Sequence, residues 1–268
     1  MDYQRIFDVL WQKYIAQNPS SKRIYDLFTR EGETVINDHI AFRTFNHPSI
    51  NIDILASVFI KNGYEEKGSY VFEEKKLFAR HYEHVSDPDA PRVFISELLT
   101  ERFSDHMRKV VNEWVAAIPT EVILSEELIY SGNVSGIPSY KIYEKLRLES
   151  EYAGWLYVNG FCANHFTVSV NRLHEYDSIE KVNRFLKSNG FLLNGGDKDI
   201  QGTPQELLEQ SSIRAGINRV MFQEGEFDIP GCYYEFARRY PDNGGALYSG
   251  FIAKSADKIF ESTNFYKK

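Results

Sequence analysis

Two segments of this 268-residue chain repeat one another, and the repeat limits the fold more than any other feature. Each segment begins with a strand-like run that contains a histidine, His39 in the first and His165 in the second. An amphipathic helical run follows in each and stops at a glycine, Gly63 or Gly190, a common signal for the end of a helix. From His39 to Gly63 is 24 residues and from His165 to Gly190 is 25. This agreement favours two copies of one unit over an unrelated α+β protein in which two helix ends are similar by coincidence.

Hydrophobic periodicity predicts the order of elements in each unit. The first unit is expected to contain a strand, a helix and three further strands, over residues 34–45, 54–62, 64–72, 77–84 and 92–98. The second begins near residue 161 and is expected to contain a helix over 178–189, a short helix capped by Thr203, and strands near 215–223 and 231–238. Further helices are expected over residues 2–30, 104–117 and 255–261. The predicted fold is α+β: one domain over residues 1–268, with two β-α-β-β-β modules (about 34–98 and 161–238) whose sheet curls around one site and whose helices lie outside.

Composition excludes several classes of function. The 43% hydrophobic and 26% charged content is typical of a globular domain in water. A net charge of −7 and an isoelectric point near 5.6 argue against a nucleic-acid partner, because such surfaces are normally basic. No apolar run is long enough to cross a bilayer, and the N-terminus does not read as a signal peptide, so we expect a cytoplasmic protein without a membrane partner. Cys162 and Cys232 are expected to be packing residues that face away from the site.

The strands that carry the histidines also predict a metal site. Side chains alternate between the two faces of a strand, so each histidine shares its face with small or polar residues and has bulky apolar residues behind it. The last strand of each unit carries a glutamate, Glu97 or Glu235. Two histidines and a carboxylate on paired strands form the facial triad typical of non-haem Fe(II) oxygenases. We therefore predict that His39 and His165 bind one metal, and the spacing leaves both Glu235 and Glu97 open as the third ligand.

Arg43 lies on the same face of its strand as His39, about two pleats away. An ordinary surface arginine or an ion pair would account for it. A guanidinium beside a metal-binding histidine, however, also suits bidentate capture of a carboxylate. We predict that Arg43 holds the distal carboxylate of a dicarboxylic substrate whose other end binds the metal. The remaining five histidines are interpreted as structural or solvated.

Several motifs carry a resemblance to known proteins. Paired β-α-β-β-β modules resemble the vicinal oxygen chelate superfamily, in which the sheets enclose a metal site. More specifically, residues 35–44 (VINDHIAFRT), 164–167 (NHFT) and 233–236 (YYEF) resemble the 2-oxoadipate dioxygenase/decarboxylase family. The resemblance covers nearly the whole chain, including residues 251–262 (FIAKSADKIFES).

The family resemblance implies an activity and a set of site residues. His39, His165 and Glu235 would bind Fe(II), and Arg43 would bind the distal carboxylate and set specificity. The substrate would also contact the segment at Lys254, Ser255 and Ala256, where Lys254 replaces the small apolar residue expected from the family. The implied reaction is an oxidative decarboxylation of a 2-oxo dicarboxylic acid by O2. With 2-oxoadipate as the substrate, the products would be 2-hydroxyglutarate and CO2. This chain is much shorter than the bacterial enzymes of lysine degradation in the family, which leaves the exact 2-oxo acid open.

Two other classes of function remain open from the sequence. A glyoxalase-like metal-dependent isomerase or lyase would use the same scaffold without O2, so consumption of O2 on addition of a 2-oxo acid separates the two. A non-catalytic small-molecule-binding module would keep the fold but not the metal. The two histidines and the glutamate count against that second alternative.

Overall fold

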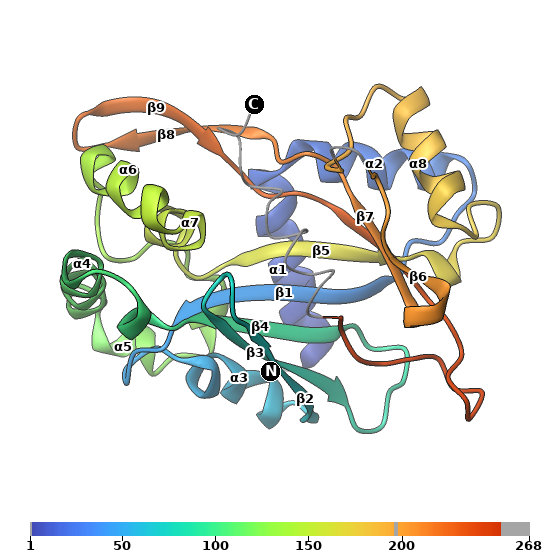
Figure 1. The fold of residues 1–268 in the computed structure, drawn as a ribbon, viewed down its shortest axis with the longest axis horizontal. Helices are drawn as coiled ribbons and strands as arrows, with labels where there is room; N and C mark the ends of the chain where they lie inside the picture. The colour runs from blue at the N-terminus through green and yellow to red at the C-terminus, as the bar shows by residue number, and fades with distance from the viewer. Residues whose placement is uncertain (1, 196–197, 253–268) are drawn as a thin grey trace.

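The computed structural model describes residues 2–195 and 198–252 of the chain. Within these residues, eight strands form one continuous sheet in the order β2-β3-β4-β1-β5-β10-β7-β6. The strands are β1 (Asn37–Phe45), β2 (Tyr64–Phe72), β3 (Leu77–His84), β4 (Arg92–Leu98), β5 (Ala163–Ser169), β6 (Gln201–Thr203), β7 (Leu208–Ser212) and β10 (Glu235–Arg239). Figure 1 shows β1 and β5 side by side along the middle of the molecule.

The sheet consists of two equivalent halves. In the first, β1 is followed by α3 (Ile52–Lys61) and by β2, β3 and β4, and β1 pairs in parallel with β4. In the second, β5 is followed by α8 (Ile179–Ser188) and by β6, β7 and β10, and β5 pairs in parallel with β10. An antiparallel ladder between β1 and β5 joins the halves. This arrangement confirms the predicted pair of β-α-β-β-β modules.

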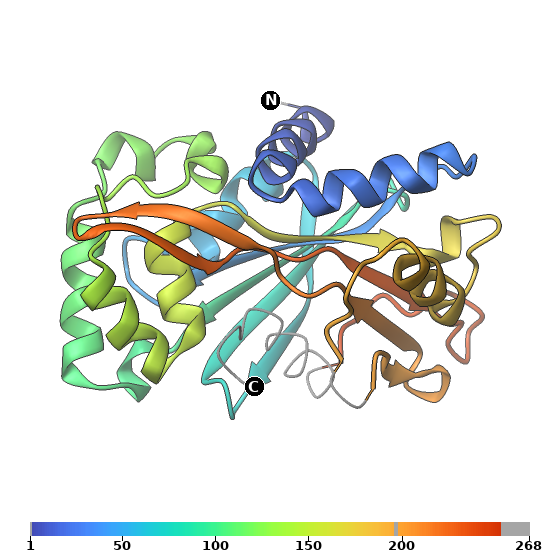
Figure 2. The ribbon, with the colours of Figure 1, turned by 90° about the horizontal axis from the view of Figure 1, so that it is seen from above.

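Helices pack on both faces of this curled sheet. They are α1 (Tyr3–Gln17), α2 (Pro19–Arg30), α3, α4 (Asp105–Ala116), α5 (Thr120–Ile123), α6 (Tyr140–Glu149), α7 (Glu151–Asn159) and α8, with 3₁₀ turns at η1 (Thr100–Arg102), η2 (Glu126–Tyr130), η3 (Val170–Arg172) and η4 (Pro204–Glu206). In Figure 2, α1 and α2 lie on one side of the sheet, whereas β2 and β3 curl toward the other. Helices α1, α2, α3 and α8 therefore cover the outer face of the sheet, whereas α4 and α7 pack against Phe45 and Arg43 at one end of its inner face.

The core lies between the outer face and the helices. Phe42 of β1 packs against Phe59 of α3, with ring centroids 5.5 Å apart, and Phe166 of β5 packs against Trp11 of α1 at 5.0 Å. Because strand side chains alternate, the outward positions of Phe42 and Phe166 place His39 and His165, at odd spacings from them, on the inner face. The N-terminal helical region is divided at Asn18, after which Pro19 starts α2 at a position where a missing backbone N–H costs nothing.

Several predicted elements differ from the structure. The strand expected near residues 215–223 is β8 (Ile217–Phe222), but it pairs with β9 (Gly225–Pro230) in a separate two-stranded ribbon. The third strand of the second module is β7, which the hydrophobic pattern did not reveal. The helix expected after Thr203 is only the 3₁₀ turn η4, although Thr203 does cap it by accepting a hydrogen bond from the Glu206 N–H.

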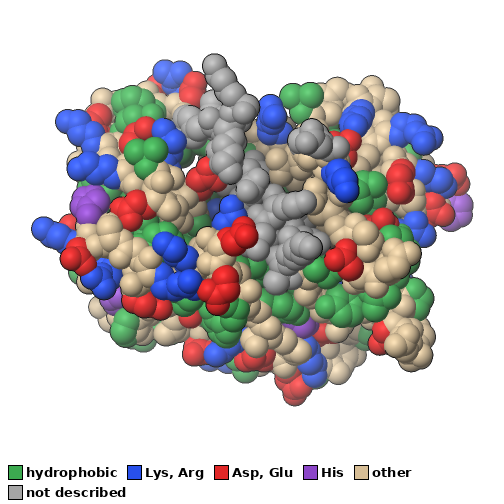
Figure 3. All heavy atoms as spheres, in the orientation of Figure 1, with side chains coloured by type: hydrophobic (Ala, Val, Ile, Leu, Met, Phe, Trp, Pro, Cys, Tyr) green, Lys and Arg blue, Asp and Glu red, His purple; other side chains and the backbone are tan. Residues whose placement is uncertain are grey.

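Three findings concern the surface and the tail. Charged side chains of both signs are intermixed over the face in Figure 3. Among the described residues, no helix has the length and apolar character needed to span a membrane. The helix predicted over residues 255–261 lies outside the described residues, as do Lys254 and Ser255.

Candidate metal centre

His39, His165 and Glu235 converge on the inner face of the sheet, each of them buried. The ladders place His39 of β1 opposite Thr167 of β5, and Thr167 in turn opposite Glu235 of β10. His165 lies two residues before Thr167 on the same strand. Nε2 of His39 lies 3.5 Å from one carboxylate oxygen of Glu235, and Nε2 of His165 lies 3.5 Å from the other. One potential ligand atom from each residue falls within 4.8 Å of the others, so a single ion could contact all three.

Two irregularities in the β1–β5 ladder affect the residues that directly precede the histidines. The pairing skips Asp38 between Asn37 and His39 on one strand, and it skips Asn164 between Ala163 and His165 on the other. An extra, unpaired residue bends a strand locally and redirects its side chains. In this case it places the residue that precedes each histidine alongside the imidazole ring.

Each of the three residues has a side-chain partner of its own. Nδ1 of His39 lies 2.8 Å from Asp38 Oδ1, and Nδ1 of His165 lies 3.0 Å from Asn164 Oδ1. Since both partner atoms accept hydrogen bonds, the ring proton of a neutral histidine sits on Nδ1 and the Nε2 lone pair points into the site.

Gln210 of β7 donates a hydrogen bond to Oε1 of Glu235. The other oxygen, Oε2, is buried and has no hydrogen-bond partner among the described residues. Gln210 therefore orients the carboxylate and leaves one oxygen available to an ion.

Burial controls the electrostatics of the cluster. It raises the pKa of the Glu235 carboxyl to about 8, despite the opposing hydrogen bond from Gln210. Burial also lowers the pKa of His39, which Asp38 partly counteracts, and lowers that of His165 well below its ordinary value. Without a cation these groups are driven toward neutral forms. A divalent ion would favour ionised Glu235 and neutral histidines, so the donor set fits such an ion.

Glu97, the other candidate third ligand, is not part of the cluster. It lies farther along β4, where its carboxylate accepts a hydrogen bond from the Ile52 N–H at the start of α3. The strand register identifies the residue of the first module that is equivalent to Glu235. Ala41 and Thr167 each lie two residues after their histidine, and Ala41 pairs with Phe94 as Thr167 pairs with Glu235. The residue equivalent to Glu235 in the first module is therefore Phe94, which is apolar and unable to bind a metal.

Arg43 lies four residues beyond His39 on β1 and is 3% exposed. Its guanidinium carbon lies 4.9 Å from the ring centroids of both Tyr152 and Trp155, one turn apart on α7. The Tyr152 hydroxyl is fixed in turn, because it accepts a hydrogen bond from the Thr44 N–H and lies 2.7 Å from the Ser96 carbonyl oxygen. The aromatic residues thus hold the guanidinium in a restricted orientation.

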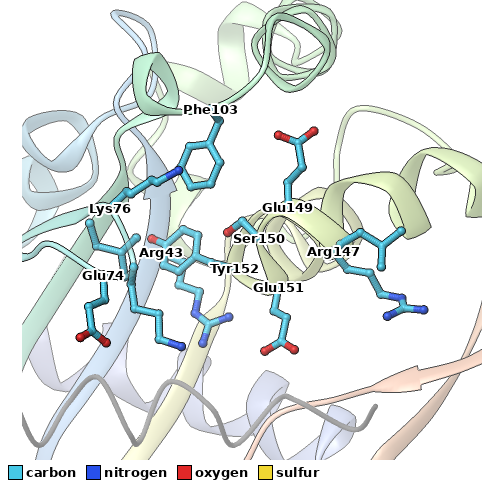
Figure 4. A pocket seen from close by; sticks show the side chains of 12 residues that line it. Arg43, Glu74, Lys76, Phe103, Arg147, Glu149, Ser150, Glu151 and Tyr152 are labelled. Atoms are coloured by element: carbon cyan, nitrogen blue, oxygen red, sulfur yellow. The ribbon is translucent and has the colours of Figure 1, made fainter. Parts of the chain in front are cut away.

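Arg43 also lines a pocket of about 330 Å³. Figure 4 shows Arg43 and Tyr152 between Glu74 and Lys76 of the β2–β3 turn on one side and residues of the α6–α7 junction on the other. A small acidic molecule that reached Arg43 here would meet a buried cation surrounded by aromatic rings.

Sequence reasoning missed the residues that support the cluster: Asp38, Asn164, Gln210 and Arg239. A signal for two of them was present, since each unit has an amide or carboxylate residue directly before its histidine. Gln210 and Arg239 are brought to the site by strand pairing alone. Cys162 and Cys232 are buried thiols, in agreement with the packing role predicted for them.

Comparison with known proteins identifies the family. The chain matches the family 2-oxoadipate dioxygenase/decarboxylase over residues 2–131 and 121–249. It is 34% identical over 284 residues to the chloroplastic 2-oxoadipate dioxygenase/decarboxylase of Arabidopsis thaliana, covering 93% of this chain and 74% of that protein.

Solved structures agree with this match. The hydroxyglutarate synthase of Oryza sativa in complex with 2-oxoadipate is 31% identical, with a TM-score of 0.90 over 98% of this chain and 92% of the rice chain. A protein of Shewanella frigidimarina NCIMB 400, provisionally designated a hydrolase, is 46% identical, with a TM-score of 0.90 over 94% of this chain and 98% of that one. A glyoxalase superfamily protein of Ralstonia eutropha JMP134, 23% identical with a TM-score of 0.73 over 91% of this chain and 83% of that one, shares the fold. Sequence and structure thus lead to the same assignment, and the chain belongs to the 2-oxoadipate dioxygenase/decarboxylase family.

Proposed function

We propose that this protein is an Fe(II)-dependent dioxygenase and decarboxylase that converts 2-oxoadipate and O2 into 2-hydroxyglutarate and CO2. The observation that carries the proposal is the buried cluster of His39, His165 and Glu235, a set of ligands typical of non-haem Fe(II) oxygenases. The named substrate comes from the relatives, because the rice structure holds 2-oxoadipate and the Arabidopsis protein is named for it.

In this proposal His39, His165 and Glu235 would hold the ion, since a site of this class needs only three protein ligands. Bound Fe(II) would supply the chemistry for binding the 2-oxo acid and activating O2. Asp38, Asn164 and Gln210 keep the donor atoms aimed at the ion, so little reorganisation is needed when it binds.

Arg43 is proposed to recognise the substrate end that does not bind the metal. The residue is nearly fully buried, and its planar guanidinium can donate two parallel hydrogen bonds to a carboxylate. Arg43 and His39 lie on the same face of β1. A substrate with one acidic group at each end would therefore extend along this strand, from the ion to Arg43. We also propose that Lys254 and Ser255 contact the substrate, as the family resemblance implies.

The walls of the site would limit access of water. Phe251 lies edge-on to the ring of His39, with centroids 4.8 Å apart, and Tyr233 stacks on His165 at 4.8 Å. Each histidine ring thus has an aromatic ring packed against it. We further propose that residues 1–268 act as one functional unit and that the protein works in the cytoplasm, whereas the Arabidopsis relative is named as chloroplastic.

The experiment that tests this function is an oxygen-electrode assay of metal-stripped protein reconstituted anaerobically with Fe(II). The panel should contain 2-oxoglutarate, 2-oxoadipate, its one-carbon-longer homologue and a 2-oxo monoacid. We expect O2 uptake that requires Fe(II), is fastest with 2-oxoadipate and is abolished in His165→Ala. Turnover of 2-oxo acids without O2 uptake would instead support a metal-dependent isomerase, lyase or hydrolase on the same scaffold.

A further inference from the structure

A buried arginine outside the three-residue cluster connects it to the last described segment of the chain. Arg239, at the end of β10, is 2% exposed. Its Nε and Nη2 donate hydrogen bonds of 2.7 and 2.8 Å to the two carboxylate oxygens of Asp38, which in turn holds Nδ1 of His39. This is the bidentate geometry in which arginine and carboxylate pair most strongly.

The third nitrogen of the same guanidinium holds the polypeptide after β10. Nη1 of Arg239 donates to the carbonyl oxygens of Tyr248 and Gly250, at 2.9 and 2.7 Å. The guanidinium carbon lies 5.1 Å from the ring centroid of Phe251, whose ring meets His39 edge-on. The Phe251 N–H also donates to the hydroxyl of Tyr70 on β2. We call residues 248–251 the tail strap.

These contacts form a closed circuit from His39 through Asp38 and Arg239 to the tail strap, and from Phe251 back to His39. The backbone of Arg239 is fixed as well, because the amide of Asn171 accepts from its N–H at 2.8 Å and donates to its carbonyl at 2.9 Å. Arg239 therefore has little freedom to move without disturbing either Asp38 or the strap. An ion that fixes the ring of His39 would fix the other members of the circuit with it.

We propose that Arg239 is a positioning residue that couples the metal ligand His39 to the seating of the tail strap. The inference rests on the metal-binding role proposed above for His39, but not on the identity of the substrate. Coupling of this kind is reciprocal: if a seated strap raises the affinity for the metal, the metal must favour the seated strap by the same factor.

The coupling predicts that loss of Arg239 changes the metal affinity in the direction opposite to that expected from its charge alone. Arg239 carries a positive charge close to a site for a cation, so loss of that charge should by itself strengthen metal binding. A positioning role predicts weaker binding, because Asp38 would no longer be held in place to orient His39. Removing a group that orients a metal-binding histidine typically lowers metal affinity by about 10- to 100-fold.

Arg92 offers a matched control. Its Nη1 lies 3.7 Å from the same Asp38 carboxylate and it carries the same charge, but it lacks the hydrogen bonds that Arg239 donates to the strap carbonyls and is linked to the strap indirectly, through Glu83. Arg92→Gln and Arg239→Gln therefore remove one positive charge each from the neighbourhood of Asp38. Arg239→Lys is the milder variant. Lysine keeps the positive charge, but its single ammonium group cannot bind both Asp38 oxygens and both strap carbonyls at once, as the planar guanidinium does.

The test measures Co(II) affinity from visible absorption and hydrogen exchange of peptides that span the tail strap, with and without Zn(II). We expect Zn(II) to slow exchange of the strap in the wild-type protein and in Arg92→Gln. In Arg239→Gln we expect about 10- to 100-fold weaker Co(II) binding and no slowing by Zn(II), with an intermediate loss in Arg239→Lys.

Wild-type protein that binds the metal without any added protection of the strap would overturn the coupling, whether or not the variants fold. Tighter Co(II) binding in Arg239→Gln would also overturn it, because loss of charge alone would then explain the result. Equal weakening in Arg92→Gln would overturn it as well, because the loss of affinity would then not depend on the contacts that Arg239 makes with the strap. In these cases the proposed function would stand. Wild-type protein that binds no divalent ion would overturn the inference and the proposed function together.

Discussion

Replacing Arg43 with lysine separates recognition of the distal carboxylate from metal binding. Lysine keeps the positive charge and can still lie against Tyr152 and Trp155, but it loses the planar fork that grips two carboxylate oxygens. A hydrogen bond to a charged group contributes about 1.5–3 kcal/mol, so the loss corresponds to about 10- to 150-fold in binding. Because Arg43 is 3% exposed, water cannot easily replace the missing donor, and we expect the upper half of that range.

The assay compares KM and kcat for 2-oxoadipate and for a 2-oxo monoacid of similar length. We expect Arg43→Lys to raise KM for the diacid by that factor and to change the monoacid by less than about threefold, since the monoacid has no distal carboxylate. Metal affinity should be unchanged, because Arg43 belongs to the pocket and not to the cluster of potential ligands. Equal losses for diacid and monoacid would refute the proposed role of Arg43.

Three further predictions follow from the geometry of the site. His165→Ala should abolish the rise in melting temperature that Co(II) produces in the wild-type protein; an unchanged rise would remove His165 from the ligand set. Burial raises the pKa of Glu235 to about 8, and a metal ion must displace the proton of that carboxyl group. Co(II) affinity should therefore fall by about tenfold per pH unit as the pH drops below 8, with release of a proton on binding. An affinity that is constant between about pH 6 and 8 would contradict this. Tyr152→Phe keeps the ring against Arg43 but leaves the buried Thr44 N–H unpaired, so the free energy of unfolding in urea should fall by about 1–3 kcal/mol while Co(II) affinity stays constant.

The sequence predicted the modules well because their signals are local. Both module helices end just before a glycine with positive φ, Gly63 at 89° and Gly190 at 81°, a conformation that favours glycine. Alternation of apolar and polar residues along β1 and β5 then determined which side chains face the interior. These two signals were sufficient to place His39 and His165 on equivalent strands.

The remaining features depend on contacts that are distant in sequence. Spacing could not separate Glu235 from Glu97, because the register of β4 against β1 decides the matter and assigns Phe94 to the equivalent position. The alternating pattern of residues 217–222 correctly indicated a strand, but not that it pairs with β9 outside the main sheet. Helix α7 was missed because nearly all its residues are buried, so it has no polar face to produce a helical period.

The two bulges at Asp38 and Asn164 could not be predicted from the alternation of side chains along a regular strand. Such a pattern assigns both residues to the face opposite their histidines. In the structure, each instead lies within hydrogen-bonding distance of the adjacent imidazole. The support of the candidate metal site therefore depends on the departures from regular pairing and not on the regular strands themselves.

The proposed function requires that His39, His165 and Glu235 hold the Fe(II) ion that would supply the chemistry for the reaction of O2 with a 2-oxo acid. In the proposed reaction the substrate carboxyl group leaves as CO2 with its own two oxygens, so both atoms of O2 must remain in 2-hydroxyglutarate. The most direct measurement is mass spectrometry of the product formed by Fe(II)-loaded protein from 2-oxoadipate under ¹⁸O₂ in unlabelled water. We predict 2-hydroxyglutarate that carries two labelled oxygens, together with unlabelled CO2, and no product in Glu235→Ala. Product without the label, or product formed equally well without O2, would contradict the account.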